Sequence, residues 1–212
     1  MDPVIDLARR LGIRSELRRE YALALGVSEV SLLELTAAYQ VFANRGVHSP
    51  PFAVRRVVGP GDAILEEQSS AGQQVLSEQL TFLMTSLLEG VVERGTGKTA
   101  KRIGRPVAAK TGTSQAAEDL WFLGYTPSLV AGVWLGYDQP RSLGSHETAG
   151  KLAAPIWVDF IRQSLGNSPI EAFLPPDGVF QVSVNRRTGE PTSRSDPEAF
   201  QEFFIRDRKS VV

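Results

Sequence analysis

Three closely spaced runs of strand-forming residues constrain the fold of this chain more than any other feature. They occupy residues 106–111, 120–125 and 129–137. Thr126-Pro127-Ser128 joins the second run to the third and predicts a tight hairpin, which makes these two strands antiparallel. The second run is aromatic-rich and does not alternate with polar residues, as expected of a strand buried on both faces. The segment therefore predicts an antiparallel sheet.

Helical signatures lie on both sides of these strands in the sequence. Ser31 and Glu34 match a capping box, in which each side chain satisfies a backbone N–H at the start of a helix. The apolar residues that follow have helical spacing. Two further helices are predicted over 77–93 and 151–166. Their expected buried faces are Leu80, Leu83, Met84, Leu87, Leu88 and Val91 in the first, and Ile156, Trp157, Phe160 and Ile161 in the second. This order of elements predicts an α+β fold, with helices covering an antiparallel sheet.

The remaining segments are shorter or more polar. A short helix is predicted near residues 2–11, and two short strands flank Pro60-Gly61-Asp62. One more strand is predicted over 179–184. Residues 186–212 are mostly polar and charged, which predicts a disordered tail after a folded region at 1–185.

Composition excludes several classes of function. Lys and Arg number 23 against 24 Asp and Glu, a net charge of -1, so no nucleic-acid partner is expected. The chain has no cysteine, and its two histidines, His48 and His146, are far apart, so no metal ion and no cofactor is predicted. The longest apolar stretch, 129–137, is interrupted by two glycines and is shorter than the roughly 20 residues of a spanning helix. We therefore expect neither a signal peptide nor a membrane anchor in this sequence.

The segment Ala109-Lys110-Thr111-Gly112-Thr113-Ser114 is the first with a clear chemical use. Small residues around one lysine keep side-chain bulk away from the strand, so that an acyl or carboxylate group can lie against the backbone. The ammonium supplies charge, the threonine hydroxyls supply hydrogen bonds, and a backbone N–H can donate to a developing oxyanion. A Lys-Thr-Gly string alone is weak evidence, because it also occurs by chance in exposed turns.

The neighbouring segments strengthen this interpretation. The chain resembles the penicillin-binding protein transpeptidase family, and within it the class A, bifunctional branch. The resemblance extends over roughly residues 1–190 and is carried in order by 25–35, 37–39, 42–44, 93–97, the Lys110-Thr111-Gly112 string, 119–127, 130–138 and 153–157.

The resemblance implies a mechanism and a place of action. In the family, a serine attacks the penultimate D-alanyl carbonyl of a peptidoglycan stem peptide ending in D-Ala-D-Ala, and a second stem peptide resolves the acyl-enzyme into a cross-link. β-Lactams acylate the same serine. By analogy, Lys110 would neutralise the substrate carboxylate and tune proton transfer, while Thr111 and Thr113 would bond that carboxylate and the Thr113 N–H would join the oxyanion hole. The expected location is the extracytoplasmic face of the cell membrane.

Two of the three motifs of the family are not where this mechanism needs them. None of the five lysines has a serine three residues before it, so there is no Ser-x-x-Lys string. A Ser-x-Asn string occurs only at 183–185, after Lys-Thr-Gly, where we expect a strand residue that faces solvent. Both motifs are expected upstream of Met1. The fold is therefore expected to be an incomplete transpeptidase fold that exposes apolar surface, is inactive alone, and is completed by an upstream part of the domain.

Other interpretations remain open at this point. The chain could be a non-catalytic module that binds stem peptide or completes another chain as a split domain. A serine β-lactamase relative shares Lys-Thr-Gly but explains the strands at 121–138 poorly. Among single residues, Ser114 has no general base nearby and is expected to shape the strand end, and Asp119 is expected to anchor a loop. Trp121, Trp134 and Trp157 are expected in the core.

Overall fold

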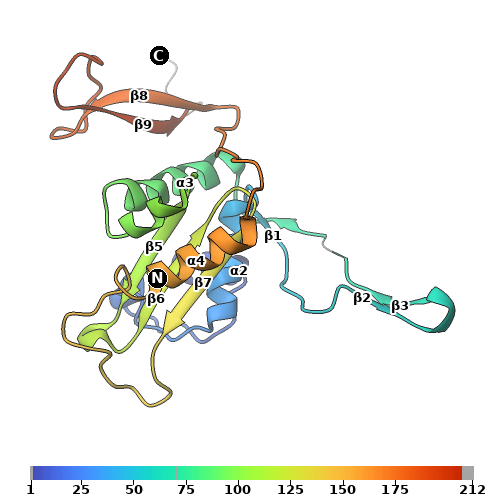
Figure 1. Ribbon diagram of the computed structural model, residues 1–212. Helices are drawn as coiled ribbons and strands as arrows, with labels where there is room; N and C mark the ends of the chain where they lie inside the picture. The colour runs from blue at the N-terminus through green and yellow to red at the C-terminus, as the bar shows by residue number, and fades with distance from the viewer. Residues whose placement is uncertain (1, 70, 207–212) are drawn as a thin grey trace.

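The computed structural model describes residues 2–69 and 71–206 (Figure 1). A three-stranded sheet forms its centre, a two-stranded hairpin at 179–205 lies over the body at the top of Figure 1, and another at 56–67 extends from the body to the right. In chain order the elements are α1 (Asp2–Arg10), η1 (Tyr21–Leu25), α2 (Leu32–Ala43), β1 (Val47–His48), β2 (Arg56–Val58), η2 (Pro60–Asp62), β3 (Ile64–Glu67), β4 (Gln73–Gln74), α3 (Glu78–Glu93), η3 (Lys98–Ile103), β5 (Ala108–Thr113), η4 (Gln115–Ala117), β6 (Leu120–Tyr125), β7 (Val130–Leu135), α4 (Ala153–Leu165), β8 (Val179–Asn185) and β9 (Ala199–Ile205), where η marks a 3-10 helix.

The central sheet has the order β5-β6-β7 and is antiparallel throughout. Residues 126–129 connect β6 to β7, and the backbone N–H of Thr126 donates to the Leu129 carbonyl at 2.9 Å, which closes the predicted hairpin. β6 is the middle strand and is buried along nearly its whole length. The α+β class, the antiparallel pairing and the buried second strand are confirmed.

Helices cover the two faces of this sheet. On one face, Ala108 and Tyr125 pack with Leu88 of α3 and with aromatic side chains of α2. On the other face, Phe122 packs against Trp157 of α4, which crosses the sheet in Figure 1. The sheet is therefore the middle layer, with α2 and α3 on one side and α4 on the other.

Trp157 closes the core on the α4 side. Its side chain is fully buried, and its Nε1 donates to the Ala131 carbonyl at 2.9 Å. Its ring lies 5.3 Å from the Phe122 ring. Gly124 makes this contact possible, because a Cβ at that position would lie 3.0 Å from the Trp157 ring and 2.9 Å from the Ala109 Cβ. A larger residue in β6 would therefore force α4 away from the sheet.

The predicted buried faces of α3 and α4 are only partly right. In α3 Leu88 is buried, but Leu80 and Leu87 are 48% and 58% exposed, and threonines occupy core positions instead. Thr81 and Thr85 fit there because each hydroxyl donates to the carbonyl one turn back, so that no polar group is left unpaired. In α4 Trp157 and Ile161 are buried, whereas Ile156 and Phe160 are exposed. The described chain thus exposes apolar surface, as expected.

The capping box at the start of α2 is present and larger than predicted. The Glu34 backbone N–H donates to Ser31 Oγ at 3.2 Å, and the Ser31 N–H donates to the Glu34 carboxylate at 3.3 Å. The same carboxylate accepts from the Ser15 hydroxyl at 2.5 Å and from the Arg14 backbone N–H at 2.8 Å. These hydrogen bonds, the Ser15 hydroxyl first, lower the pKa of Glu34 to about 2. One carboxylate therefore ties the irregular segment after α1 to the first turn of α2.

The disordered tail predicted for 186–212 is wrong for residues 186–206. These residues turn back through a loop and form β9, which pairs with β8 over seven residue pairs. The loop is held by Asp196, which accepts from Asn185 Nδ2 and the Thr192 hydroxyl. Phe203 of β9 packs edge-on against Phe82 of α3, with ring centroids 5.0 Å apart. The prediction relied on the mostly polar composition of the segment and overlooked the apolar contacts made by the aromatic residues of β9. Residues 207–212 lie outside the described part.

Ser183, expected to face solvent, has a buried Oγ with no hydrogen-bond partner among the described residues. β2 and β3 form an exposed ribbon around the predicted Pro60–Asp62 turn, and it extends from the body in Figure 1. Within residues 2–69 and 71–206, no helix combines the length and apolarity needed to cross a membrane.

Two substitutions three residues apart in α4 test the core assignment. Trp157→Ala removes a fully buried ring and its hydrogen bond, so we expect the free energy of unfolding to fall by about 3–5 kcal/mol. Phe160→Ala, at a site that is 52% exposed, should cost less than about 1 kcal/mol. Urea unfolding followed by circular dichroism measures both. Equal costs would contradict the placement of α4.

Candidate functional site

The candidate site is the second half of β5, the edge strand of the central sheet. Ala108 and Ala109 are fully buried, whereas Lys110 and Thr113 are exposed and the two residues between them are partly exposed. β6 pairs with one edge of β5, and no strand in residues 2–69 and 71–206 pairs with the other. β5 therefore begins in the core and ends as an accessible strand with a free backbone edge.

The side chains of this half leave the strand on both faces. Lys110 lies opposite Leu123 in the register, and so on the face of α2 and α3, while Thr111 and Thr113 lie opposite Phe122 and Leu120, on the face of α4. The Lys110 ammonium donates to the Thr111 carbonyl at 2.8 Å. A group lying along the free edge would reach the ammonium from one face and the hydroxyls from the other.

Both threonine hydroxyls contact flanking loops. The Thr111 Oγ1 lies 2.5 Å from the Thr96 Oγ1, in the turn that follows α3. The Thr113 Oγ1 accepts from the Ala149 backbone N–H at 3.3 Å, in the loop that precedes α4. The free half of β5 is therefore attached to the ends of two helices, one on each side of the sheet.

On the face of the sheet opposite these threonines, Gly112 presents no side chain beside Trp121. Its backbone lies outside the left-handed region, and a Cβ there would lie 3.2 Å from the Trp121 Cβ. The absence of a side chain therefore serves close approach rather than an unusual backbone conformation.

The end of β5 is fixed by residues that were expected to be structural. The Ser114 Oγ accepts from the Asp119 N–H at 2.8 Å, and the Ser114 N–H donates to the Asp119 carbonyl at 3.0 Å. The Asp119 carboxylate accepts from Trp134 Nε1 at 2.9 Å. Ser114 shapes the strand end and Asp119 anchors the loop, as predicted. Of the three tryptophans, Trp157 is fully buried and the other two are partly exposed.

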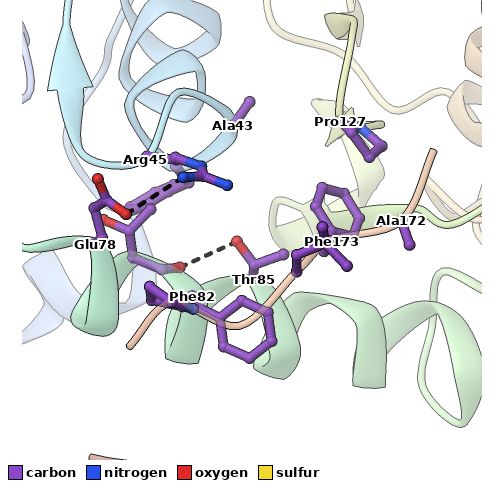
Figure 2. A pocket seen from close by; sticks show the side chains of 12 residues that line it. Ala43, Arg45, Glu78, Phe82, Thr85, Pro127, Ala172 and Phe173 are labelled. Atoms are coloured by element: carbon purple, nitrogen blue, oxygen red, sulfur yellow. Dashed lines mark hydrogen bonds and ion pairs between the residues drawn. The ribbon is translucent and has the colours of Figure 1, made fainter. Parts of the chain in front are cut away.

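A pocket of about 240 Å³ lies at the other end of the sheet (Figure 2). Its walls include Phe82 and Phe173, and an ion pair between Arg45 and Glu78 at 3.5 Å stands on one side. Pro127 is also in its wall and follows Tyr125, the last residue of β6. Thr113 pairs with Leu120, at the opposite end of β6. This pocket is therefore separate from the candidate site.

A second pocket of about 400 Å³ is bordered by charged side chains of α3, η3 and the segment before β5. Glu93 pairs there with Lys101 at 2.5 Å, whereas Glu89 lies one turn earlier on α3 and is partly buried. Burial, and secondly the charge of Glu93, raise the pKa of Glu89 to about 7. Composition and spacing gave no sign of this carboxyl, because its burial depends on how η3 and the segment before β5 lie beside α3.

Comparison with known proteins decides the family. The model of the penicillin binding protein transpeptidase domain matches residues 14–161, which include α2, α3, the whole central sheet and most of α4. The chain belongs to the penicillin-binding protein transpeptidase family. The matched region contains the candidate site and the loops that hold its threonines.

Curated relatives point to the class A branch. The chain is 40% identical over 183 residues to penicillin-binding protein 1A of Aquifex aeolicus, with 86% of the chain and 25% of that protein covered. It is 33% identical to penicillin-binding protein 2D of Bacillus subtilis over 96% of the chain and 30% of that protein. The chain thus spans less than a third of these relatives.

Solved structures share the fold. Penicillin-binding protein 1A of Haemophilus influenzae superposes with a TM-score of 0.85 at 23% identity, covering 96% of this chain and 36% of that one. PonA1 of Mycobacterium tuberculosis, solved in complex with penicillin V, superposes with a TM-score of 0.72 at 28% identity, covering 81% and 51%. The transpeptidase fold predicted from the motifs is confirmed.

The structure also shows what sequence reasoning missed. The 93–97 turn belonged to the resemblance, but nothing in the sequence indicated that Thr96 contacts Thr111. The contact with the Ala149 backbone N–H was equally hidden. The roles expected for Lys110, Thr111, Gly112 and Thr113 remain predictions, although all four lie on the accessible edge strand.

The charge of Glu89 should destabilise the fold above neutral pH. Its pKa in the folded chain, about 7, is higher than its ordinary value of 4.5, so stability should fall as pH rises from 4.5 to 7. Glu89→Gln removes this charge. We expect it to raise the free energy of unfolding by about 1 kcal/mol at pH 8, a figure reduced for solvent screening, and to change it little at pH 4. Urea unfolding at both pH values is the measurement. The exposed Glu16→Gln is the control, and an equal gain at pH 4 and pH 8 would contradict this account.

Proposed function

We propose that β5 is the substrate-binding strand of a serine D,D-transpeptidase site that cross-links peptidoglycan stem peptides. The observation that carries the proposal is the accessible half-strand from Lys110 to Thr113, with a free backbone edge, in a member of the penicillin-binding protein transpeptidase family. An extended peptide end can lie along such an edge and bond to the backbone, as an added strand does.

The side chains along this edge suit an acyl group that ends in a carboxylate. The Lys110 ammonium would supply the positive charge for the terminal D-alanine carboxylate, and the hydroxyls of Thr111 and Thr113 would donate hydrogen bonds to it. The Thr113 backbone N–H would donate to the oxyanion that forms during acyl transfer. β-Lactams carry a carboxylate beside a strained amide, so they would occupy the same position.

The attacking serine is supplied, in this proposal, by polypeptide outside the given sequence. Transpeptidation of this kind needs a serine whose proton is taken by a nearby base, commonly the lysine of Ser-x-x-Lys, and that string does not occur here. The exposed apolar residues of α3, such as Leu80 and Leu87, offer a surface on which a completing segment can pack. The site would act at the extracytoplasmic face of the cell membrane, where peptidoglycan is built.

Labelled penicillin tests the proposal in two forms of the protein. The given chain alone should form no covalent adduct. A chimera in which this chain replaces the corresponding part of a penicillin-binding protein 1A should be acylated. Lys110→Ala in the chimera should slow acylation by roughly 10²-fold, because a positive group at the reacting centre is lost.

Lys151→Ala is the matched control. Lys151 is also exposed, and its ammonium donates to the His146 carbonyl rather than to a group of β5, so acylation should change less than about twofold. An adduct on the given chain alone would refute the need for an outside serine. Equal rates for the two lysine variants would refute the role of β5.

A further inference from the structure

Three segments meet on the threonine face of β5, at the end of the strand that is free. The turn after α3 brings Thr96 to Thr111, with 2.5 Å between the hydroxyl oxygens. The loop before α4 brings the Ala149 N–H to the Thr113 hydroxyl, at 3.3 Å. Each hydroxyl of the candidate site thus has one neighbour that comes from a helix end.

Thr96 is itself held in place by the backbone around it. The N–H groups of Gly95 and Gly97 both donate to the Val91 carbonyl, at 3.1 and 3.0 Å, and close the end of α3 around Thr96. A Cβ on Gly95 would lie 2.8 Å from that carbonyl oxygen, and a Cβ on Gly150 would lie 2.9 Å from the Thr96 carbonyl oxygen. The backbone on both sides of Thr96 is therefore tied to the last turn of α3, while the Thr96 side chain itself is exposed.

The chemistry of a threonine hydroxyl explains why these neighbours matter. A hydroxyl has one hydrogen to donate and two positions at which it can accept. When it accepts from a fixed donor, its own hydrogen is free to point elsewhere. The Thr113 hydroxyl is in this state, because the Ala149 N–H can only donate. The Thr111 hydroxyl reaches the same state only when Thr96 donates to it.

We infer that Thr96 is a positioning residue, which donates to Thr111 and so directs the Thr111 hydrogen toward a bound carboxylate. A hydrogen bond to a charged acceptor is stronger than one between neutral groups, and a chain of two hydroxyls polarises each member further. The carboxylate would then meet two oriented donors, one fixed by a backbone N–H and the other by a side chain. This inference rests on the proposed function and adds Thr96 as the residue that orients the Thr111 hydroxyl.

The first test compares two forms of one substrate in the acylation-competent chimera. Thr96→Val keeps the shape of the side chain but has no hydroxyl. With a penicillin that has a free carboxylate, we expect its second-order acylation rate constant to fall roughly tenfold. With the methyl ester of the same penicillin, which offers no carboxylate, we expect a change below about twofold.

Two further variants separate positioning from general damage. Thr96→Ser keeps the donor, so its acylation rate constant with the free acid should equal that of the unsubstituted chimera. Thr36→Val removes a hydroxyl that donates to the Leu32 carbonyl at 2.7 Å within α2, on the other face of the sheet, and should leave the acid-to-ester preference unchanged. An equal loss with acid and ester in Thr96→Val, or a loss of the preference in Thr36→Val, would overturn the inference.

A second measurement needs no acylation. In the unsubstituted chain, neutron diffraction should place the deuterium of the Thr96 hydroxyl toward the Thr111 Oγ1, and the deuterium of the Thr111 hydroxyl away from Thr96. A Thr111 deuterium directed at the Thr96 oxygen would overturn the positioning role. If the chimera is not acylated at all, the proposed function fails, while the deuterium positions still decide whether Thr96 donates to Thr111.

Discussion

β5 combines a buried first half with a second half whose outer backbone edge pairs with no strand among residues 2–69 and 71–206. β6 satisfies one side of the strand, and Ala108 and Ala109 fix its first half between helices on both faces of the sheet. The second half is accessible, with Lys110 and Thr113 exposed, because burial would remove the charged Lys110 ammonium from water. Burial at one end therefore holds rigid a strand whose other end stays accessible, which suits a site that must present fixed donors to a ligand.

The charged group and the hydroxyl groups of this strand lie on opposite faces of the sheet. Lys110 leaves the strand toward α2 and α3, and its ammonium is exposed and bonded only to the neighbouring Thr111 carbonyl within the described residues. The threonines leave it toward α4 and are held by the ends of α3 and of the loop before α4. The exposed Lys110 ammonium can therefore change position on one face, while neighbouring groups hold the threonine hydroxyls on the other.

The sequence predicted the central sheet well because its signals were local. The Thr126-Pro127-Ser128 turn, the continuous apolar run of β6 and the Ser31–Glu34 capping box each reside in a few neighbouring residues, and each is present. Burial was harder to predict, since it depends on which neighbours cover a helix: Thr85 is buried in α3 while Leu87 is exposed. β9 was missed because its phenylalanines pack against a helix more than 100 residues earlier in the chain, as Phe203 does on Phe82. For the site, the residue types of β5 were visible, but Thr96 and the Ala149 N–H act through contacts that no spacing rule describes.

A crystal structure of the chimera acylated by a penicillin would show which groups of β5 contact the ligand. We expect the penicillin to lie along the free edge of β5, with its carboxylate within hydrogen-bonding distance of the Thr111 and Thr113 hydroxyls and its carbonyl oxygen at the Thr113 N–H. A penicillin whose carboxylate points away from β5, or a strand of the completing segment paired with that edge, would contradict this expectation.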